Sequence, residues 1–499
     1  MLVRGGDKCG KNDLQEPEGL LQKIASCHGA QAGVQMTNDL IYKTATELLD
    51  LFERREASPV EAIKAVLERI EQRDKDINAF VLVDEKSALA QARESERRWN
   101  KGNSQGRLDG VPISIKDMVL TKGWPTLRGS LTVNPAGPWE EDAPCVERLR
   151  EHGAVIFGKT TMPEFGWKGV GDCELTGITR NPWNLDKTPG GSSGGASTAL
   201  AARMGPLAIG GDGGGSIRIP SSFTGVFGIK ANYGRVPSYP EGSMRNLTHL
   251  GPMTLTVEDA ALLLTVISEP DYRDWTSLVY NKEDFTHELD KGIEGLRIAY
   301  SPDLGYARVD PSVRNVVDAA AKIFEELGAN VEEKAPGFEN PLPIFLTHWG
   351  VGAAGALGSL PEVEKAKLEP ALKDFVETGR GISLSNYTDA MNQRTALCIH
   401  MRRFHRDYDL LLTPTMAVPA FDVGLLWPPD RSDAWDWSPF SYPFNLTQQP
   451  ACSVPCGFTK TGLPVGLQIV SDNFREDLVL RAAHAFEAAA KVNTLPPGF

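Results

Sequence analysis

The chain has 499 residues, of which 41% are hydrophobic, and it carries a net charge of −13. This acidic balance argues against a nucleic-acid partner, because such binding depends on Lys and Arg neutralising phosphates. No stretch approaches the roughly 18 apolar residues that a membrane-spanning helix needs, and none near the start is typical of a signal peptide.

The seven cysteines and eight histidines lack the spacings of disulfide frameworks and of metal sites. There is no Cys-x-x-Cys pair and no His-Glu-x-x-His sequence. An odd number of cysteines at low density indicates reduced thiols. We therefore expect a cytoplasmic protein that holds no metal and no cofactor.

The first ordered elements are predicted to be helices. Residues 1–36 are polar with scattered glycines, so we expect a poorly ordered extension before one domain over residues 37–499. Thr44–Glu47 and Ser58–Glu61 form capping boxes, the second with Pro59 at the first helical position. Apolar residues repeat at helical spacing behind each box, and residues 84–100 predict a third helix.

Farther along, short apolar runs alternate with helical patterns. The predicted strands are residues 111–115, 154–157, 207–209, 296–300, 410–412 and 465–470. The predicted helices are residues 142–152, 257–268, 311–327, 385–406 and 474–491. This alternation favours a mostly parallel sheet covered on both faces. We predict a single large α/β/α sandwich with a mixed central sheet, in which the Pro-rich, aromatic residues 414–464 form a long ordered loop.

Two glycine-rich loops stand out as candidates for chemistry. Residues 189–195 read PGGSSGG and residues 210–220 read GGDGGGSIRIP, which places Ser192 and Ser216 24 residues apart. Glycine lets a substrate approach the main chain closely, and successive N–H groups in such a turn can bind an anion or an oxyanion. A flexible turn is the plainer interpretation of one such loop. The presence of two such loops makes that interpretation weaker.

A serine nucleophile needs a base, and a lysine upstream can supply it. In GVPISIKD, residues 110–117, the aliphatic side chains alternate with Pro112, Ser114 and Lys116. If this segment is a strand, Lys116 points away from the aliphatic face at a strand end, where active sites collect. Taken alone, such a lysine is more often simply exposed.

These pieces together resemble the amidase signature family. The resemblance covers nearly all of residues 42–490 and is densest over residues 105–235, the expected catalytic core. The segments that carry it are GVPISIKD, GAVIFGKTTMPEF, TRNPWNLDKTPGGSSGG and GGDGGGSIRIPSSFTGVFGIK. It implies an enzyme that hydrolyses carboxylic amides through an acyl-enzyme, with the fold predicted above.

The resemblance also implies residue roles. Ser216 is the expected nucleophile, Ser192 follows a cis peptide from Gly191 and relays the proton, and Lys116 is the base. A lysine is a base only when neutral, so we expect burial to lower the pKa of Lys116.

Further positions match the family's oxyanion loop and its supports. The expected oxyanion hole consists of the backbone amides of Gly213, Gly214, Gly215 and Ser216. The expected supporting residues are Ser193, Asp212 and Arg218. Glycines at 211 and 213 depart from the family's usual pattern and imply a more flexible loop, and Gln448 stands where many relatives have glycine.

Two rival motifs give other functions. Residues 153–160, GAVIFGKT, satisfy the phosphate-binding pattern G-x-x-x-x-G-K-[ST], the mark of a P-loop NTPase. Its four middle positions are Ala154, Val155, Ile156 and Phe157, which read as a strand and not as a loop. Residues 190–194 fit G-x-S-x-G, but the α/β-hydrolase fold needs an apolar strand before the serine, and residues 185–189 cannot form one.

The substrate is less readable than the chemistry. The resemblance implies a small-molecule amide substrate, and some of the family's members cleave esters, anilides or carbamates. The glutaminase subunit of a tRNA-dependent amidotransferase is the alternative, although we find no glutamine-binding segment at residues 345–360. Residues 427–444 hold six aromatic residues, of which Trp435 and Trp437 are expected to line the cleft and favour aryl substrates. Fastening the loop to the core is the alternative role of these rings. A monomer and a homodimer are both consistent with the sequence.

Overall fold

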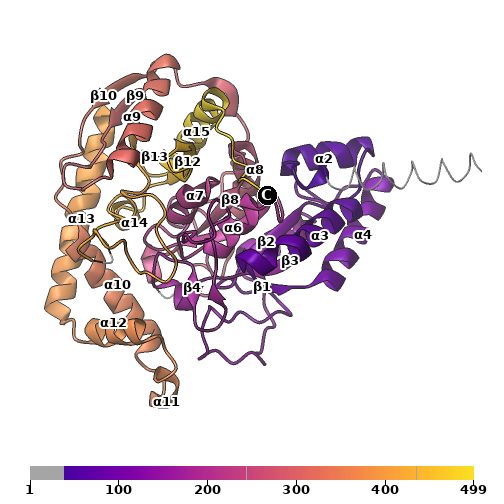
Figure 1. The fold of residues 1–499 in the computed structure, drawn as a ribbon, viewed down its shortest axis with the longest axis horizontal. Helices are drawn as coiled ribbons and strands as arrows, with labels where there is room; N and C mark the ends of the chain where they lie inside the picture. Colours follow the sequence, from indigo (N-terminus) through magenta and orange to yellow (C-terminus); the bar gives the residue numbers. More distant parts are fainter. Residues whose placement is uncertain (1–38, 243, 434) are drawn as a thin grey trace, which may run out of the picture.

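The molecule is built around one long sheet. A computed structural model describes residues 39–499 except residues 243 and 434. Within this part an eleven-stranded sheet crosses the molecule with helices on both faces (Figure 1), which confirms the predicted α/β/α sandwich. The predicted N-terminal extension, residues 1–36, lies outside the described residues.

The sheet is mixed in direction. Its strands are β1 (Phe80–Val83), β2 (Pro112–Lys116), β3 (Val155–Thr160), β6 (Leu207–Asp212), β7 (Phe227–Lys230), β8 (His249–Thr254), β9 (Arg297–Tyr300), β10 (Asn330–Glu333), β11 (Leu410–Pro414), β12 (Ala451–Phe458) and β13 (Pro464–Ser471). They are ordered β1-β3-β2-β6-β8-β7-β12-β13-β11-β9-β10. The pairs β2–β3, β2–β6, β9–β10 and β9–β11 are parallel, and the other neighbours are antiparallel. The expectation of a mostly parallel sheet was therefore wrong. The strands β7, β8 and β12 were not among the predicted strands, and every pair that they form is antiparallel.

Helices cover both faces and one end. They are α2 (Ala45–Arg54), α3 (Pro59–Ile77), α4 (Glu85–Asn100), α5 (Pro144–Glu151), α6 (Gly194–Ala201), α7 (Arg218–Thr224), α8 (Val257–Ile267), α9 (Pro311–Glu326), α10 (Leu342–Leu357), α11 (Glu362–Lys365), α12 (Pro370–Arg380), α13 (Leu384–Asp407), α14 (Pro443–Leu446) and α15 (Glu476–Ala490). Short 3-10 turns lie at Glu164–Gly166, Arg245–Leu247 and Leu289–Lys291, and β4 (Asp172–Cys173) pairs with β5 (Gly177–Ile178).

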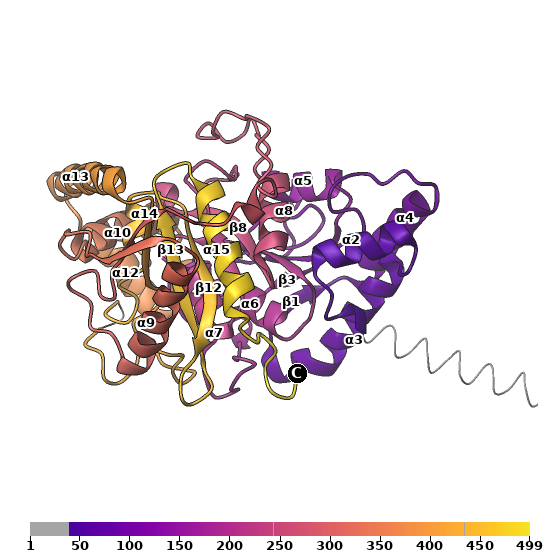
Figure 2. The same ribbon diagram turned by 90° about the horizontal axis from the view of Figure 1, so that it is seen from above.

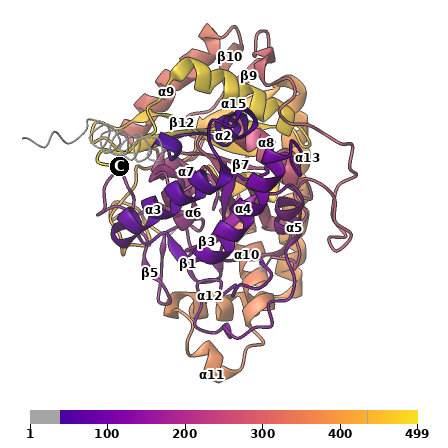
Figure 3. The same ribbon diagram turned by 90° about the vertical axis from the view of Figure 1, so that its right-hand side faces the viewer.

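The two helical layers pack on alternate side chains of the strands. Helices α5, α8, α9 and α15 share one core with the sheet, while α3, α4 and α6 share another. Seen from above, α10, α12 and α13 gather at one end and α2 and α4 at the other (Figure 2). Figure 3 looks onto α3 and α4, and α4 packs on β3.

The capping boxes in the sequence correctly predicted where the first helices begin. Thr44 and Ser58 each form both hydrogen bonds of a capping box, at the start of α2 and α3. All cysteines among the described residues are free thiols. None of the described helices is both long and apolar enough to cross a membrane.

The segment 414–464 is more regular than predicted. It contains α14 and the strand β12, which lies in the middle of the sheet between β7 and β13. Pro455 and Gly457 conceal this strand in the sequence, and the register of β12 against β13 shifts between them. Proline and glycine in a strand typically mark such irregularities.

The segment GAVIFGKT does not form a nucleotide-binding loop. Residues 155–160 are strand β3, paired to β2 on one side and β1 on the other. Lys159 is fully buried, and its Nζ donates to the Val119 carbonyl at 2.7 Å and to Thr126 Oγ1 at 2.8 Å. Its side chain therefore holds the segment that follows β2 and cannot reach a phosphate in solvent.

We predict that Lys159→Met lowers the free energy of unfolding by about 3 kcal/mol, because Asp117, 3.7 Å from Nζ, loses its buried counter-charge. Thermal denaturation measures the loss, and Lys122→Met, at an exposed lysine, is the matched control. Mg-ATP should leave the midpoint unchanged. A rise of the wild-type midpoint that Lys159→Met abolishes would restore the nucleotide-binding interpretation.

Candidate active site

The two glycine-rich loops meet at the helix starts of α6 and α7. Ser192 and Ser193 precede α6, and Ser216 ends the loop that leaves β6. The Ser193 amide donates to the Ser216 carbonyl at 3.1 Å, which ties the loops together directly. The structure thus brings the two predicted serines to one place, and Ser216 is 6% exposed.

Lys116 reaches the same place from the end of β2. Ile113 and Ile115 belong to the core under α5 and α8. Lys116 points to the opposite face, as the alternation predicts, and is 0% exposed. Its Nζ lies 2.7 Å from Ser192 Oγ, 2.8 Å from Ser193 Oγ and 3.2 Å from the Gly211 carbonyl.

Burial without a bonded carboxylate favours the neutral form of Lys116. Desolvation lowers the pKa of Lys116 to about 7, and the negative charge of Asp212 offsets only part of this effect. The neutral amine has a lone pair that can accept the Ser192 hydroxyl proton. Its two hydrogens then match Ser193 Oγ and the Gly211 carbonyl, so the three contacts accommodate the neutral amine as well as the ammonium.

The backbone at Ser192 has the predicted form. The Gly191–Ser192 peptide bond is cis. Gly166 lies against this serine, since a Cβ placed on Gly166 would come 3.0 Å from Ser192 Oγ. Gly166 has φ of +70° and lines the pocket of Ser216, a role that the sequence alone did not suggest.

The oxyanion loop differs from the prediction at one position. The Gly215 amide donates to Asp212 Oδ1 at 2.7 Å, so it is not free to bind an oxyanion. The amides of Gly213, Gly214 and Ser216 have no protein acceptor within the described residues. Of the four amides that the sequence predicts for an oxyanion hole, these three are therefore without a partner and the Gly215 amide is not.

Close packing surrounds the two extra glycines and their neighbour Gly214. A Cβ on Gly211 would come 2.7 Å from Met118 Sδ. A Cβ on Gly213 would come 2.8 Å from the Trp349 ring, and one on Gly214 would come 2.7 Å from the Phe345 ring. The two rings stack on each other at 5.2 Å. The loop therefore lies flat under two aromatic side chains of α10, and a larger residue at either position would displace a ring.

Asp212 and Arg218 form a buried ion pair that fixes this loop. Arg218 Nε donates to Asp212 Oδ2 at 2.9 Å and Nη2 donates to Oδ1 at 3.0 Å. Arg218 also donates to Ser441 O, Gln468 Oε1 and Asn445 Oδ1. Burial raises the pKa of the Asp212 carboxyl, but Arg218 and Lys230 hold that pKa well below its usual value.

A pocket of about 490 Å³ opens beside Ser216. Its walls include the predicted residues Trp435 and Trp437, together with Trp349 and Ile219. Trp437 is buried and stacks on Phe223, whereas Trp435 is half-buried and meets Phe345 edge-on at 5.3 Å. Trp437 thus packs into the core, and both rings line the pocket beside Ser216.

The only charged side chain among the described walls of this pocket is already neutralised. Lys168 Nζ lies 2.9 Å from Asp172 and 2.7 Å from Glu369.

Among the described residues there is also no cluster of three or more potential metal ligands.

Sequence reasoning missed Phe345, Trp349, Ser441 and Asn445. The first two lie in an almost entirely apolar helix, α10, whose periodicity does not show which face is buried. Asn445 is a buried polar residue within an aromatic run, and that contrast is a signal that could have been used.

The pattern of one family, Amidase, matches residues 61–480, which is most of the chain. This chain belongs to the amidase family. It is therefore an enzyme of the class that hydrolyses amide bonds. An acylamidase of Rhodococcus erythropolis is 37% identical over 461 residues, which cover 90% of this chain and 96% of that protein.

Two further relatives also match over most of this chain. A glutamyl-tRNA(Gln) amidotransferase subunit of Myxococcus xanthus is 37% identical over 473 residues, covering 89% of this chain and 96% of that protein. A crystal structure of a bacterial aryl acylamidase of the amidase signature family matches with a TM-score of 0.84 and 30% identity, covering 90% of this chain and 96% of that one.

We predict that the resonances of Lys116 and Lys159 titrate far below the usual range, as does that of the buried Lys230. Burial lowers the pKa of Lys116 to about 7 and that of Lys159 to about 8. NMR of the protein with ¹³Cε-labelled lysine measures both. Lys116→Met should remove the resonance near 7 and Lys159→Met the one near 8. An ordinary value for Lys116, above about 10, would contradict the neutral amine.

Proposed function

We propose that this amidase cleaves the C–N bond of carboxylic amides through an acyl-enzyme on Ser216, with Ser192 as proton relay and Lys116 as base. The single observation that carries the proposal is the 2.7 Å contact between Lys116 Nζ and Ser192 Oγ, in a fully buried site beside the mouth at Ser216. An amine with a pKa of about 7 is half neutral near pH 7, where a base is most effective.

The proposed first half-reaction starts from the contact between Lys116 and Ser192 and continues to Ser216 on the loop tied beside it. Lys116 takes the Ser192 hydroxyl proton, Ser192 takes that of Ser216, and Ser216 Oγ attacks the amide carbonyl. The amides of Gly213, Gly214 and Ser216 stabilise the oxyanion, and each such donor contributes on the order of 10²–10³ in rate in other enzymes. The proton then passes to the leaving nitrogen as the C–N bond breaks.

Water completes the reaction by the reverse route. The base removes a proton from water, the hydroxide attacks the ester carbonyl, and Ser216 leaves with its proton restored. The protein needs no metal for these steps, because Lys116 supplies the base and the backbone amides supply the positive field. An ester or a carbamate presents the same carbonyl and is a possible substrate on the same grounds.

The pocket walls support an apolar or aryl acyl group. Trp349, Trp435 and Trp437 surround the space beside Ser216, and aromatic rings bind large flat groups well. Lys168 is paired with two carboxylates and offers no free charge to an anionic substrate. We propose a small neutral amide or carbamate as the substrate, with anilides favoured.

A glutaminase activity is the second candidate. The 37% identity to the amidotransferase protein of Myxococcus xanthus equals the identity to the acylamidase. However, the α10 segment near the Gly213–Ser216 loop supplies Phe345 and Trp349, and neither carries a charge that would pair with the charged ends of glutamine.

We predict that Ser216→Ala lowers kcat for an amide substrate by at least about 10³-fold, because the acyl-enzyme cannot form. Phenylmethanesulfonyl fluoride should label Ser216, which peptide mass spectrometry detects. Ser385→Ala, an exposed serine of α13, is the matched control and should keep full activity. Labelling at Ser192 instead would support the G-x-S-x-G alternative.

We predict that kcat/KM for an aryl acyl-anilide exceeds that for glutamine by at least about 100-fold, since the walls offer aromatic contact and no free cation. Trp435→Ala should lower the anilide value about tenfold. Trp427→Ala, in the same segment but outside the pocket walls, should not change it. A higher value for glutamine would favour the glutaminase function and reject the aryl-binding pocket.

A further inference from the structure

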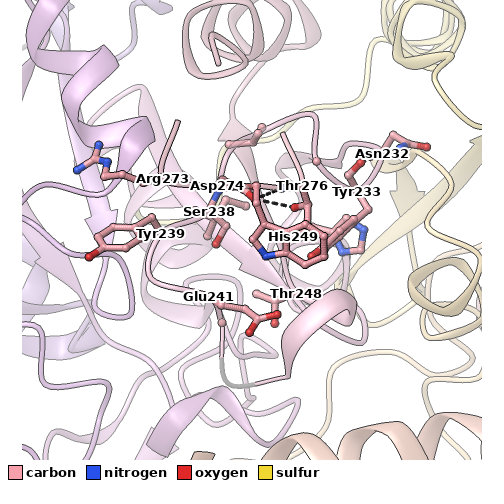
Figure 4. Close-up of a pocket in the computed structure, with 15 residues that line it drawn as sticks. Asn232, Tyr233, Ser238, Tyr239, Glu241, Thr248, His249, Arg273, Asp274 and Thr276 are labelled. Atoms are coloured by element: carbon pink, nitrogen blue, oxygen red, sulfur yellow. Dashed lines mark hydrogen bonds between the residues drawn. The ribbon is translucent and has the colours of Figure 1, made fainter. Parts of the chain in front are cut away.

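A second pocket lies behind the oxyanion loop and shares no wall residue with the pocket of Ser216. It measures about 570 Å³ and is formed by residues 232–242, the start of β8 and residues 273–276 (Figure 4). In this view Asp274, Ser238 and Thr276 lie on one side of it, Glu241 and Thr248 on the other, and His249 between them.

His249 is one of the residues that line this pocket, and its ring has an unused acceptor. Its Nδ1 lies 2.8 Å from the Leu247 carbonyl and 3.3 Å from the Asp212 carbonyl. Because both neighbours are acceptors, Nδ1 carries the hydrogen. Burial and the nearby Lys230 hold the pKa of His249 well below its usual value, so the ring is neutral and Nε2 is a bare lone pair. Nε2 is buried and has no hydrogen-bond partner within the described residues.

The charges around the pocket are negative in balance. Asp274 and Glu241 both line it. Arg273 also lines it, but its Nη2 already binds Asp271 and Glu147. No ion pair to Asp274 or Glu241 occurs among the side chains that the structure describes. Asp274 accepts hydrogen bonds from the Ser238 amide and from the Thr276 amide and hydroxyl, whereas Glu241 is exposed. An unpaired histidine acceptor beside two negative charges favours a ligand that is a cation and a hydrogen-bond donor.

Aromatic rings complete the walls. Trp275 lines the pocket although it is 90% exposed, an unusual position for so large an apolar side chain. Tyr239 and Tyr233 are further walls, but the Arg273 guanidinium already lies over the Tyr239 ring at 5.3 Å, and the Tyr233 ring meets His249 edge-on at 5.7 Å. Aromatic faces attract organic cations through the ring quadrupole.

We infer that this pocket is a binding site for a small primary ammonium ion. One N–H of the ligand donates to His249 Nε2, another to the Glu241 carboxylate, and its hydrocarbon part lies on the exposed ring of Trp275. Anions are repelled by the two carboxylates, and neutral ligands leave the charge of Glu241 unpaired. The site is separate from Ser216 and does not depend on the function proposed above.

The position of His249 also gives the ligand a route to the oxyanion loop. His249 pairs with Asp212 in the register between β6 and β8. A ligand on Nε2 therefore polarises the ring whose Nδ1–H faces the Asp212 carbonyl, at the residue where that loop begins. Occupancy of the pocket is therefore expected to change the rate of catalysis.

Isothermal titration of the full-length protein with n-butylammonium chloride at pH 7.5 tests the inference. We expect saturable binding of one equivalent, at least about tenfold tighter than that of sodium butyrate or n-butanol. Glu241→Gln should weaken it about tenfold and Trp275→Ala severalfold. Glu326→Gln, at an exposed glutamate of α9, is the matched control and should bind as the wild type does.

NMR of protein with ¹⁵N-labelled histidine provides a readout without any variant. The Nε2 resonance of His249 should move on addition of n-butylammonium, because its lone pair accepts a hydrogen bond. An unmoved resonance, equal binding of n-butanol, or equal binding by Glu241→Gln and Glu326→Gln would each overturn the site. Binding that Trp435→Ala abolishes would place the ligand at Ser216 and also overturn it.

Discussion

The buried ion pair between Asp212 and Arg218 is the interaction on which the arrangement of the site depends. Both residues are 0% exposed, and each carries a charge that water cannot reach. Removing one partner of such a pair typically costs about 3–5 kcal/mol, because the other is left uncompensated. Arg218 also binds Asn445 in α14 and Gln468 in β13. The pair thereby joins the oxyanion loop to the C-terminal segment that carries the pocket walls.

Two buried lysines on neighbouring strands show how their surroundings set different roles. Lys159 lies beside Asp117 and two oxygen acceptors, which together hold a positive charge in place. Lys116, on β2, touches hydroxyls and one carbonyl but no carboxylate. The first arrangement is typical of a structural cation and the second of a neutral base. A sequence motif centred on either lysine does not reveal this difference, because the neighbours come from distant segments.

Much of the fold could be predicted because its signals are local. The capping boxes at Thr44 and Ser58 and the strand ending in Lys116 depend on residues close in sequence. The strand β12 could not be predicted, since Pro455 and Gly457 hide it. At the site, the motifs indicated both serines and the lysine. They could not show that Asp212 takes the Gly215 amide, nor that Phe345 and Trp349 cover the loop, because these contacts form only in the folded chain.

The covering of the oxyanion loop by α10 has an evolutionary consequence. The Phe345 ring packs against Gly214 and the Trp349 ring against Gly213. Trp349 also lines the pocket of Ser216. A substitution on α10 that reshapes the pocket for a new acyl group therefore also shifts the backbone amides of Gly213 and Gly214, which are the proposed oxyanion donors. In this lineage substrate range and turnover are expected to change together, and adaptation to a new substrate requires matched changes in the glycine loop and in a helix more than a hundred residues away.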